Sequence, residues 1–142
     1  MSSESSSTAL RASPRGCGEV VLIVDDEPLL AELAVRQITD LGYVALAFTS
    51  SRSALQALFD APAMVDLVLT DESMPELSGS ELVASIRARG LDIPIVLVSG
   101  DVTATLKDRA RAAGVCEVLS KPLHDVSLAT ALACGLQAKR RQ

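Results

Sequence analysis

Acidic residues and one lysine stand directly after short apolar runs of this chain. Asp25 and Asp26 follow one run, Asp71 follows a second, and Lys121 stands just past a third. Carboxylates gathered in one place repel one another and need a cation, and hard oxygen ligands favour Mg²⁺. Such a cluster can bind Mg²⁺ while one carboxylate attacks phosphorus, and a nearby lysine adds a second positive charge for the phosphoryl oxygens.

A serine completes this set, because Ser99 ends a fourth apolar run and its hydroxyl can donate a hydrogen bond to a phosphoryl oxygen. Each signal alone is weak. The paired acids could be helix-capping residues, Asp71 or Ser99 could belong to a turn, and Lys121 could be a solvated cation. Their joint occurrence after four apolar runs favours one assembled site.

The elements that must position these residues alternate regularly along the chain. Short apolar runs predict strands at 20–24, 43–48, 65–70, 93–98 and 115–119. Helical patterns follow each run, at about 28–41, 51–61, 78–90, 103–113 and 125–138. Strands that alternate with helices in this way predict a parallel sheet covered by helices on both faces.

Helix boundaries are marked by capping residues. Pro28 suits the first turn of the first helix, where its missing N–H costs nothing. Either Ser50 or Ser51 can cap the second helix, and either Ser78 or Ser80 can begin the third.

The order of the strands decides whether the polar residues meet. Ligands of open parallel sheets bind beyond the carboxyl ends of the strands. In the flavodoxin-like, doubly wound order 2-1-3-4-5, the first, third and fourth strands lie side by side. That order would bring Asp25, Asp26, Asp71 and Ser99 together.

Composition excludes several classes of protein. The 142 residues fit one domain, and a net charge of −5 argues against direct nucleic-acid binding. No apolar run approaches the roughly 20 residues of a membrane helix. Three cysteines without a CxxC pair argue against a disulfide framework and predict a reducing, cytoplasmic setting, with Cys116 packed as a small apolar residue.

The motifs together resemble those of response-regulator receiver domains. The segment 21–28, VLIVDDEP, is similar to the opening of that family, and 71–79, DESMPELSG, resembles its phosphorylation loop. Ser99 stands where the family keeps a Ser or Thr, and Lys121-Pro122 matches its Lys-Pro pair. The resemblance covers residues 19–138, which leaves a Ser-rich, disordered leader or linker at 1–18 and a basic tail at 139–142.

The resemblance implies a phosphoacceptor at Asp71, which would take a phosphoryl group from a phosphohistidine. Ser99 would grip that group and Lys121 would pair with it, while the bond before Pro122 is usually cis in the family.

The resemblance also implies a Mg²⁺ site. Asp26 and Asp71 would bind the ion directly, Asp25 would act through water, and Ser73 would supply its backbone carbonyl.

Three positions bear on tuning and signal transmission. Many receivers carry an aromatic residue three positions before the lysine, where this chain has Val118, so the usual relay to the adjoining surface is altered or absent. Ser73 and Asp101 flank the phosphoryl group in the family and tune its hydrolysis. His124, the only histidine, is expected to be a surface residue.

The predicted function is therefore a signalling switch that is not a turnover enzyme and has no DNA-binding output of its own. Its expected partner is a histidine kinase or histidine phosphotransfer protein, and it would be a monomer or weak dimer. It would be a stand-alone protein or the C-terminal receiver of a hybrid kinase.

Three alternatives compete with this prediction. A phosphatase with an aspartate nucleophile would typically have a DxD motif, and a nucleotide-binding protein would have a GxGxxG or GxxxxGK[ST] loop, neither of which occurs here. A degenerate receiver would lack part of the acidic set.

Overall fold

The predicted strands pair as a parallel sheet in the order β2-β1-β3-β4-β5, as expected for a flavodoxin-like fold. The computed structural model describes residues 15–140. The strands are β1 (Val20–Val24), β2 (Val44–Phe48), β3 (Leu67–Asp71), β4 (Ile95–Ser99) and β5 (Glu117–Ser120).

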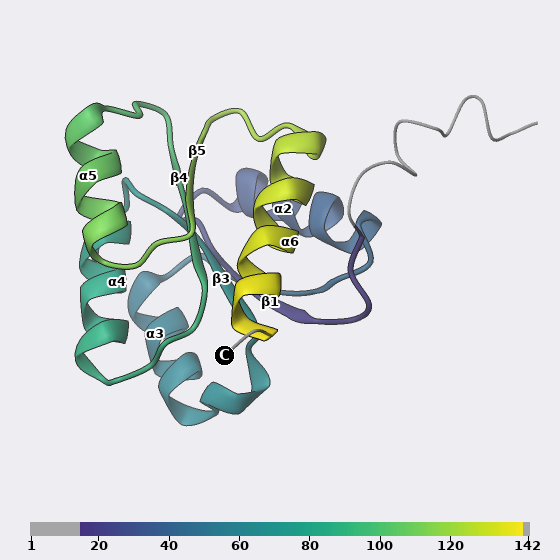
Figure 1. Ribbon diagram of the computed structural model, residues 1–142, viewed down its shortest axis with the longest axis horizontal. Helices are drawn as coiled ribbons and strands as arrows, with labels where there is room; N and C mark the ends of the chain where they lie inside the picture. Colours follow the sequence, from purple (N-terminus) through teal and green to yellow (C-terminus); the bar gives the residue numbers. More distant parts are fainter. Residues whose placement is uncertain (1–14, 141–142) are drawn as a thin grey trace, which may run out of the picture.

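Helices cover both faces of this sheet, which gives three layers (Figure 1). Helices α2 and α6 lie on one face, and α3, α4 and α5 lie on the other. The helices are α2 (Pro28–Asp40), α3 (Ser51–Asp60), α4 (Gly79–Ala88), α5 (Ala104–Ala112) and α6 (Asp125–Arg140), with a short 3₁₀ turn, η1 (Pro62–Met64).

The alternation of side chains along β1 explains the two cores. Val21 and Ile23 pack in the cluster that includes α2 and α6, whereas Leu22 and Val24 pack in the cluster under α3 and α4. Because β1 is buried on both faces, it reads as an uninterrupted apolar run. The acids that follow β1, and the acid that ends β3, are thus attached to strands buried in the core.

Hydrogen bonds at the helix starts show which of the candidate serines cap α3 and α4. Ser50 caps α3, since its side chain accepts a hydrogen bond from the Ser53 N–H. Ser78 caps α4 in a reciprocal capping box with Glu81. Both arrangements satisfy N–H groups that a helix start leaves without partners.

Four strands begin later than expected, β2 by one residue and β3, β4 and β5 by two. β3 starts at Leu67, because η1 comes first and the carboxylate of Asp66 accepts a hydrogen bond from the Val20 N–H at 2.8 Å. β5 starts at Glu117, after Gly114, whose φ of +78° reverses the chain at the end of α5.

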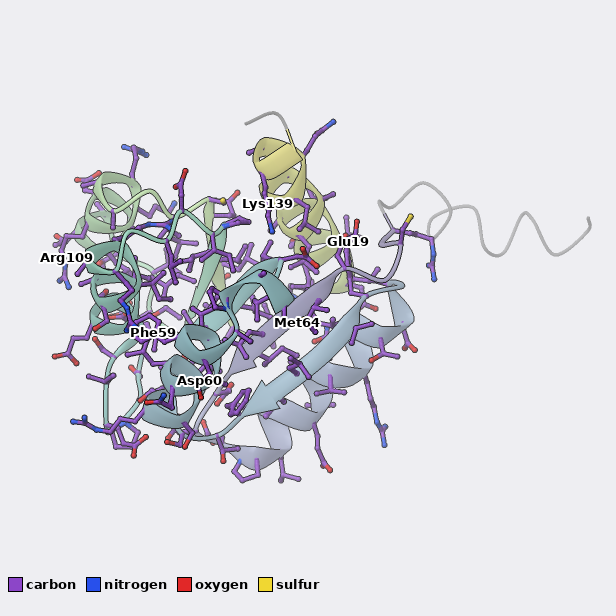
Figure 2. All side chains as sticks on the ribbon, turned by 90° about the horizontal axis from the view of Figure 1, so that it is seen from below. Glu19, Phe59, Asp60, Met64, Arg109 and Lys139 are labelled. Carbon is purple, nitrogen blue, oxygen red and sulfur yellow. The ribbon has the colours of Figure 1, made fainter. Side chains whose placement is uncertain are left out.

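The two ends of the receiver-like region reach further than the sequence suggested. The Gly16 N–H donates to the Leu41 carbonyl at 2.7 Å, so the part of the expected leader at 15–18 is tied to the turn after α2; residues 1–14 lie outside the described part. At the other end α6 continues to Arg140, past the expected boundary at 138, and Lys139, labelled on α6 in Figure 2, pairs with Asp66 at 3.2 Å.

The prediction that Cys116 is packed away from solvent was wrong, since this residue is exposed. Over residues 15–140, no helix is both long and apolar enough to span a lipid bilayer.

Candidate functional site

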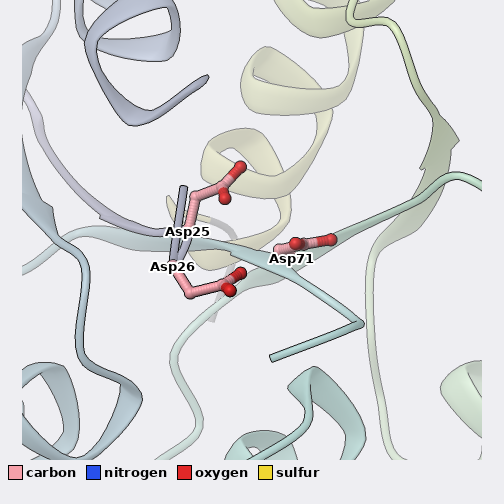
Figure 3. A group of neighbouring side chains, drawn as sticks. All are labelled: Asp25, Asp26 and Asp71. Carbon is pink, nitrogen blue, oxygen red and sulfur yellow. The ribbon is translucent and has the colours of Figure 1, made fainter. Parts of the chain in front are cut away.

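Three carboxylates converge at the carboxyl edge of the sheet. Asp71 is the last residue of β3, and Asp25 and Asp26 follow β1, which pairs directly with β3. One oxygen of each carboxylate lies within 4.8 Å of the others. Figure 3 shows the three side chains as neighbours at this edge, with Asp25 and Asp26 adjacent in the chain and Asp71 beside them. Neighbouring parallel strands therefore build the acidic cluster that the sequence predicted.

Asp71 is the most buried of the three, with 5% of the residue exposed. Loss of hydration raises the pKa of its carboxyl group, and Lys121 offsets this effect only in part. The Lys121 Nζ lies 3.1 Å from one Asp71 oxygen and 3.6 Å from one Asp25 oxygen. The Asp71 carboxylate is therefore poorly hydrated and is held at a fixed position by its ammonium partner.

The position of Lys121 is fixed by its backbone N–H and by its peptide bond to Pro122. Its N–H donates to the Ser99 carbonyl at 2.9 Å, and its bond to Pro122 is cis, as the motif led us to expect. Partial burial lowers the pKa of its ammonium, but the hydrogen bond to Asp71 and the charge of Asp25 outweigh burial, so the pKa is raised. The ammonium therefore stays charged beside the acids.

Ser99 ends β4 at the same edge of the sheet. Its hydroxyl donates to the Asp101 carbonyl and accepts from the Asp101 N–H, both at 3.1 Å. The hydroxyl is thus engaged by the loop after β4, which it would have to leave in order to reach a group on Asp71. Ser73 is exposed in the loop after β3, and its backbone hydrogen-bonds to the Asp71 carboxylate.

Val118 lies on β5 in a small cluster under α5. It packs with Leu97, Leu106 and Ala110, and the last two are the buried residues of α5. Val118 is therefore a packing residue beneath α5, a helix that buries only two of its side chains. His124 is exposed, as expected.

Two residues that fix the loop after Asp71 were not singled out from the sequence. The carboxylate of Glu72 accepts hydrogen bonds from the Ser80 N–H and hydroxyl, both at 2.9 Å. A Cβ on Gly79 would lie 2.5 Å from the Asp71 carbonyl oxygen. The motif glycine is thus required for close approach of α4 to Asp71, a signal that its place in the motif could have given.

The far side of the same loop is pinned to α3. The Ser50 hydroxyl donates to the Glu76 carboxylate at 2.7 Å, and this bond lowers the pKa of Glu76. The Leu77 N–H donates to the Ser51 hydroxyl at 3.0 Å. Each contact spans 26 residues of sequence, so no local pattern signals it.

This geometry accords with comparisons to known proteins. A sequence model for the response regulator receiver domain matches residues 21–133. The chain belongs to the response-regulator receiver family. This receiver domain is also 36% identical over 115 residues to the two-component response regulator ORR41 of Oryza sativa subsp. japonica, which covers 80% of the chain and 91% of that protein.

Other relatives are much longer. The receiver domain is 33% identical over 122 residues to the sensor histidine kinase RcsC of Salmonella typhi, which covers 86% of the chain and 13% of the kinase. The chain therefore spans about an eighth of the length of that relative.

Solved structures show the same fold. The receiver domain protein of Clostridium thermocellum has a TM-score of 0.82 at 24% identity, over 87% of this chain and 98% of that one. The chemotaxis protein CheY4 of Vibrio cholerae has a TM-score of 0.77 at 26% identity, over 84% and 99% of the two chains. The chain is thus a receiver domain of the two-component type, with the acidic cluster, lysine and serine of its motifs gathered at one edge.

Proposed function

We propose that this receiver domain accepts a phosphoryl group on the Asp71 carboxylate and acts as a signalling switch or relay. The observation that carries the proposal is the setting of Asp71, whose buried carboxylate lies 3.1 Å from the Lys121 ammonium and beside two further acids. The donor would be a phosphohistidine of a histidine kinase or of a histidine phosphotransfer protein.

The donor set fits Mg²⁺. The three carboxylates carry three formal negative charges against one from Lys121, and their oxygens are hard ligands. Asp26 and Asp71 would contact the ion, Asp25 would act through water, and the Ser73 carbonyl would complete the protein ligands. The ion would neutralise charge on the phosphoryl oxygens.

The chain's own residues would perform the transfer as follows. An oxygen of Asp71 forms a bond to phosphorus while the bond between phosphorus and the donor imidazole nitrogen breaks, and the imidazole leaves with the electron pair and takes up a proton. Lys121 pairs with a phosphoryl oxygen, and Ser99 exchanges its hydrogen bond to Asp101 for one to the phosphoryl group. Ser73 and Asp101 would tune later hydrolysis of the acyl phosphate.

The proposed role includes no catalytic turnover of an external substrate and no direct contact with nucleic acid or membrane. We propose a cytoplasmic location and a monomer or weak dimer. Both a stand-alone response regulator and a receiver of a hybrid kinase fit this role, given the relatives of both kinds.

The direct test is exposure of the purified protein to acetyl phosphate with and without Mg²⁺, followed by intact mass spectrometry. The expected result is a gain of one phosphoryl group that requires Mg²⁺, disappears in Asp71→Ala and is strongly reduced in Asp26→Ala. Asp92→Ala, which changes an exposed acid away from the cluster, is the matched control and should be labelled like wild type. Full labelling of Asp71→Ala would show that the acceptor is a different residue.

A further inference from the structure

A cavity of about 530 Å³ lies behind the acidic cluster. Nine of its fourteen lining residues are apolar, and they come from α2, from the three central strands and from the loop before α6. The apolar residues on which the argument depends are Ile23, Leu30, Leu33, Ala34, Leu69 and Leu123. A cavity of this size with mostly hydrocarbon walls, open to solvent beside the exposed Leu33, can bind a small organic molecule.

The cavity has a fixed far wall. The Gln37 Nε2 donates to the Leu123 carbonyl at 3.0 Å and to an Asp125 carboxylate oxygen at 2.9 Å. These two bonds tie α2 to the loop that follows Pro122 and to the first residue of α6. The space between the helix and the loop is therefore maintained by contacts that do not involve the acidic cluster.

One end of the cavity is charged. Asp25, Asp71 and Lys121 all line it, whereas Asp26 does not. These three residues carry a net formal charge of −1, and Asp26 next to them adds a further negative charge. A ligand that extends from the apolar walls toward this end would meet an excess of negative charge, which a cationic group would complement.

We propose that the cavity is a binding site for a small amphipathic monocation, with an apolar chain between α2 and the sheet and a terminal ammonium facing Asp25. The apolar portion would contact Leu30, Leu33 and Leu123. The ammonium would donate charge-assisted hydrogen bonds to the Asp25 carboxylate, whose other contacts are the Glu27 N–H at 3.0 Å and Lys121 at 3.6 Å. This site does not depend on phosphoryl transfer to Asp71.

The site is coupled to any divalent cation held by the carboxylates. A Mg²⁺ ion at the acids changes the net charge facing the cavity from negative to neutral, because three carboxylates are then balanced by the ion and Lys121. The ion and the ammonium therefore oppose each other, and the effect is reciprocal. A ligand in the cavity would weaken Mg²⁺ binding and would thereby regulate the affinity of the acidic cluster for the ion.

The test is a titration of the metal-free protein with phenylbutylamine, followed by the backbone and methyl NMR signals of the cavity residues. Phenylbutanol and phenylpentanoate serve as the neutral and anionic probes of matched length. The amine should bind about tenfold more tightly than the alcohol, the scale of one charge-assisted hydrogen bond, and the carboxylate should bind most weakly. Saturating Mg²⁺ should weaken the amine several-fold and leave the alcohol unchanged.

Variants of α2 locate the site. Ala34→Phe should fill the cavity and abolish binding of all probes, with the NMR spectrum as the check on folding. Leu33→Ala, at a half-exposed position that tolerates truncation, should weaken the amine and the alcohol by the same factor, whereas Leu29→Ala, on the same helix but outside the cavity, should change neither. Equal affinity for amine and alcohol, no effect of Mg²⁺ on the amine, or equal effects of Leu33→Ala and Leu29→Ala would each overturn the proposal.

Discussion

The Ser99 hydroxyl is held by the backbone of Asp101, through two hydrogen bonds of 3.1 Å, although the residue lies at the same edge of the sheet as the acidic cluster. A phosphoryl group on Asp71 would compete with Asp101 for this hydroxyl. Release of Asp101 would loosen the loop that leads into α5, a helix whose buried residues are only Leu106 and Ala110. This link does not require an aromatic residue at position 118.

We therefore expect Ser99→Ala to separate phosphorylation from its structural response. The variant should still be labelled at Asp71 by acetyl phosphate, but roughly tenfold or more slowly, because one donor to the phosphoryl group is lost. Amide NMR shifts in residues 101–106 should then change little on labelling, whereas wild type and Ser99→Thr should show large changes there. Wild-type-like shifts in labelled Ser99→Ala would rule out this link.

Lys121→Met tests the ion pair with Asp71. The lysine side chain is one-quarter exposed, so removing it should cost about 1–2 kcal/mol without metal, less than for a fully buried pair. Because the pKa of Lys121 is raised in the folded state, the ion pair contributes its full stabilisation below pH 10.5, the ordinary pKa of lysine. This stabilisation is lost as the pH rises through the folded-state pKa. Urea unfolding of both proteins at neutral and strongly alkaline pH measures the difference, with Lys121→Arg as the charge-retaining control. A constant difference across that range would contradict the assignment.

Asp71→Asn should stabilise the metal-free protein. Burial raises the pKa of Asp71 above its ordinary 3.8, so the folded state binds this proton more tightly than the unfolded chain does. The wild type therefore loses stability as the pH rises from 3.8 through the folded-state pKa of Asp71. At neutral pH the variant should be more stable by about 1 kcal/mol, and the gain should shrink below pH 4.

We expect Mg²⁺ to reverse this order of stability. The ion should raise the melting temperature of wild type by binding the folded state, and should raise that of Asp71→Asn much less. Thermal unfolding followed by circular dichroism measures the melting temperatures of wild type and Asp71→Asn, each with and without Mg²⁺. The measurements are made at neutral pH and below pH 4. If Asp71→Asn is less stable than wild type without metal, burial of the charged Asp71 carboxylate does not destabilise the folded protein.

Gly79→Ala tests the contact between α4 and the end of β3. The new Cβ would lie 2.5 Å from the Asp71 carbonyl oxygen and 2.6 Å from a Leu97 methyl group, so the strand or the helix must shift. We expect a loss of about 2–4 kcal/mol and slower labelling of Asp71. Gly100→Ala is the matched control, because a Cβ there meets nothing within 4 Å. Equal stability of the two variants would refute the steric argument.

The sequence could predict the elements and the members of the site because those signals are local. A capping serine contacts an N–H three residues away, as in Ser50 with Ser53, and an apolar run is visible wherever a strand is buried. The acids that follow β1 and the acid that ends β3 were identified for the same reason. Strand starts were less accurate, since β3 begins only after η1 and the contact between Asp66 and Val20.

Contacts between distant segments could not be predicted in this way. The Gln37 amide reaches Leu123, 86 residues away, and Glu76 reaches Ser50 across 26 residues. Neither pair has a periodicity or spacing that marks it. The residues that hold the loop after β3 and the wall of the cavity could therefore be identified only from the folded arrangement.

The sequence by itself thus determined which residues stand at the carboxyl ends of the strands, and the family to which their pattern is similar. Only the tertiary structure decided that Lys121 lies 3.1 Å from Asp71, that Ser99 is engaged by Asp101, and that a cavity adjoins Asp25. The physical reason is that strand and helix signals arise from neighbours along the chain, whereas distances, charge balance and hollow space arise from the packing of β1, β3, β4 and β5 against α2 and α6.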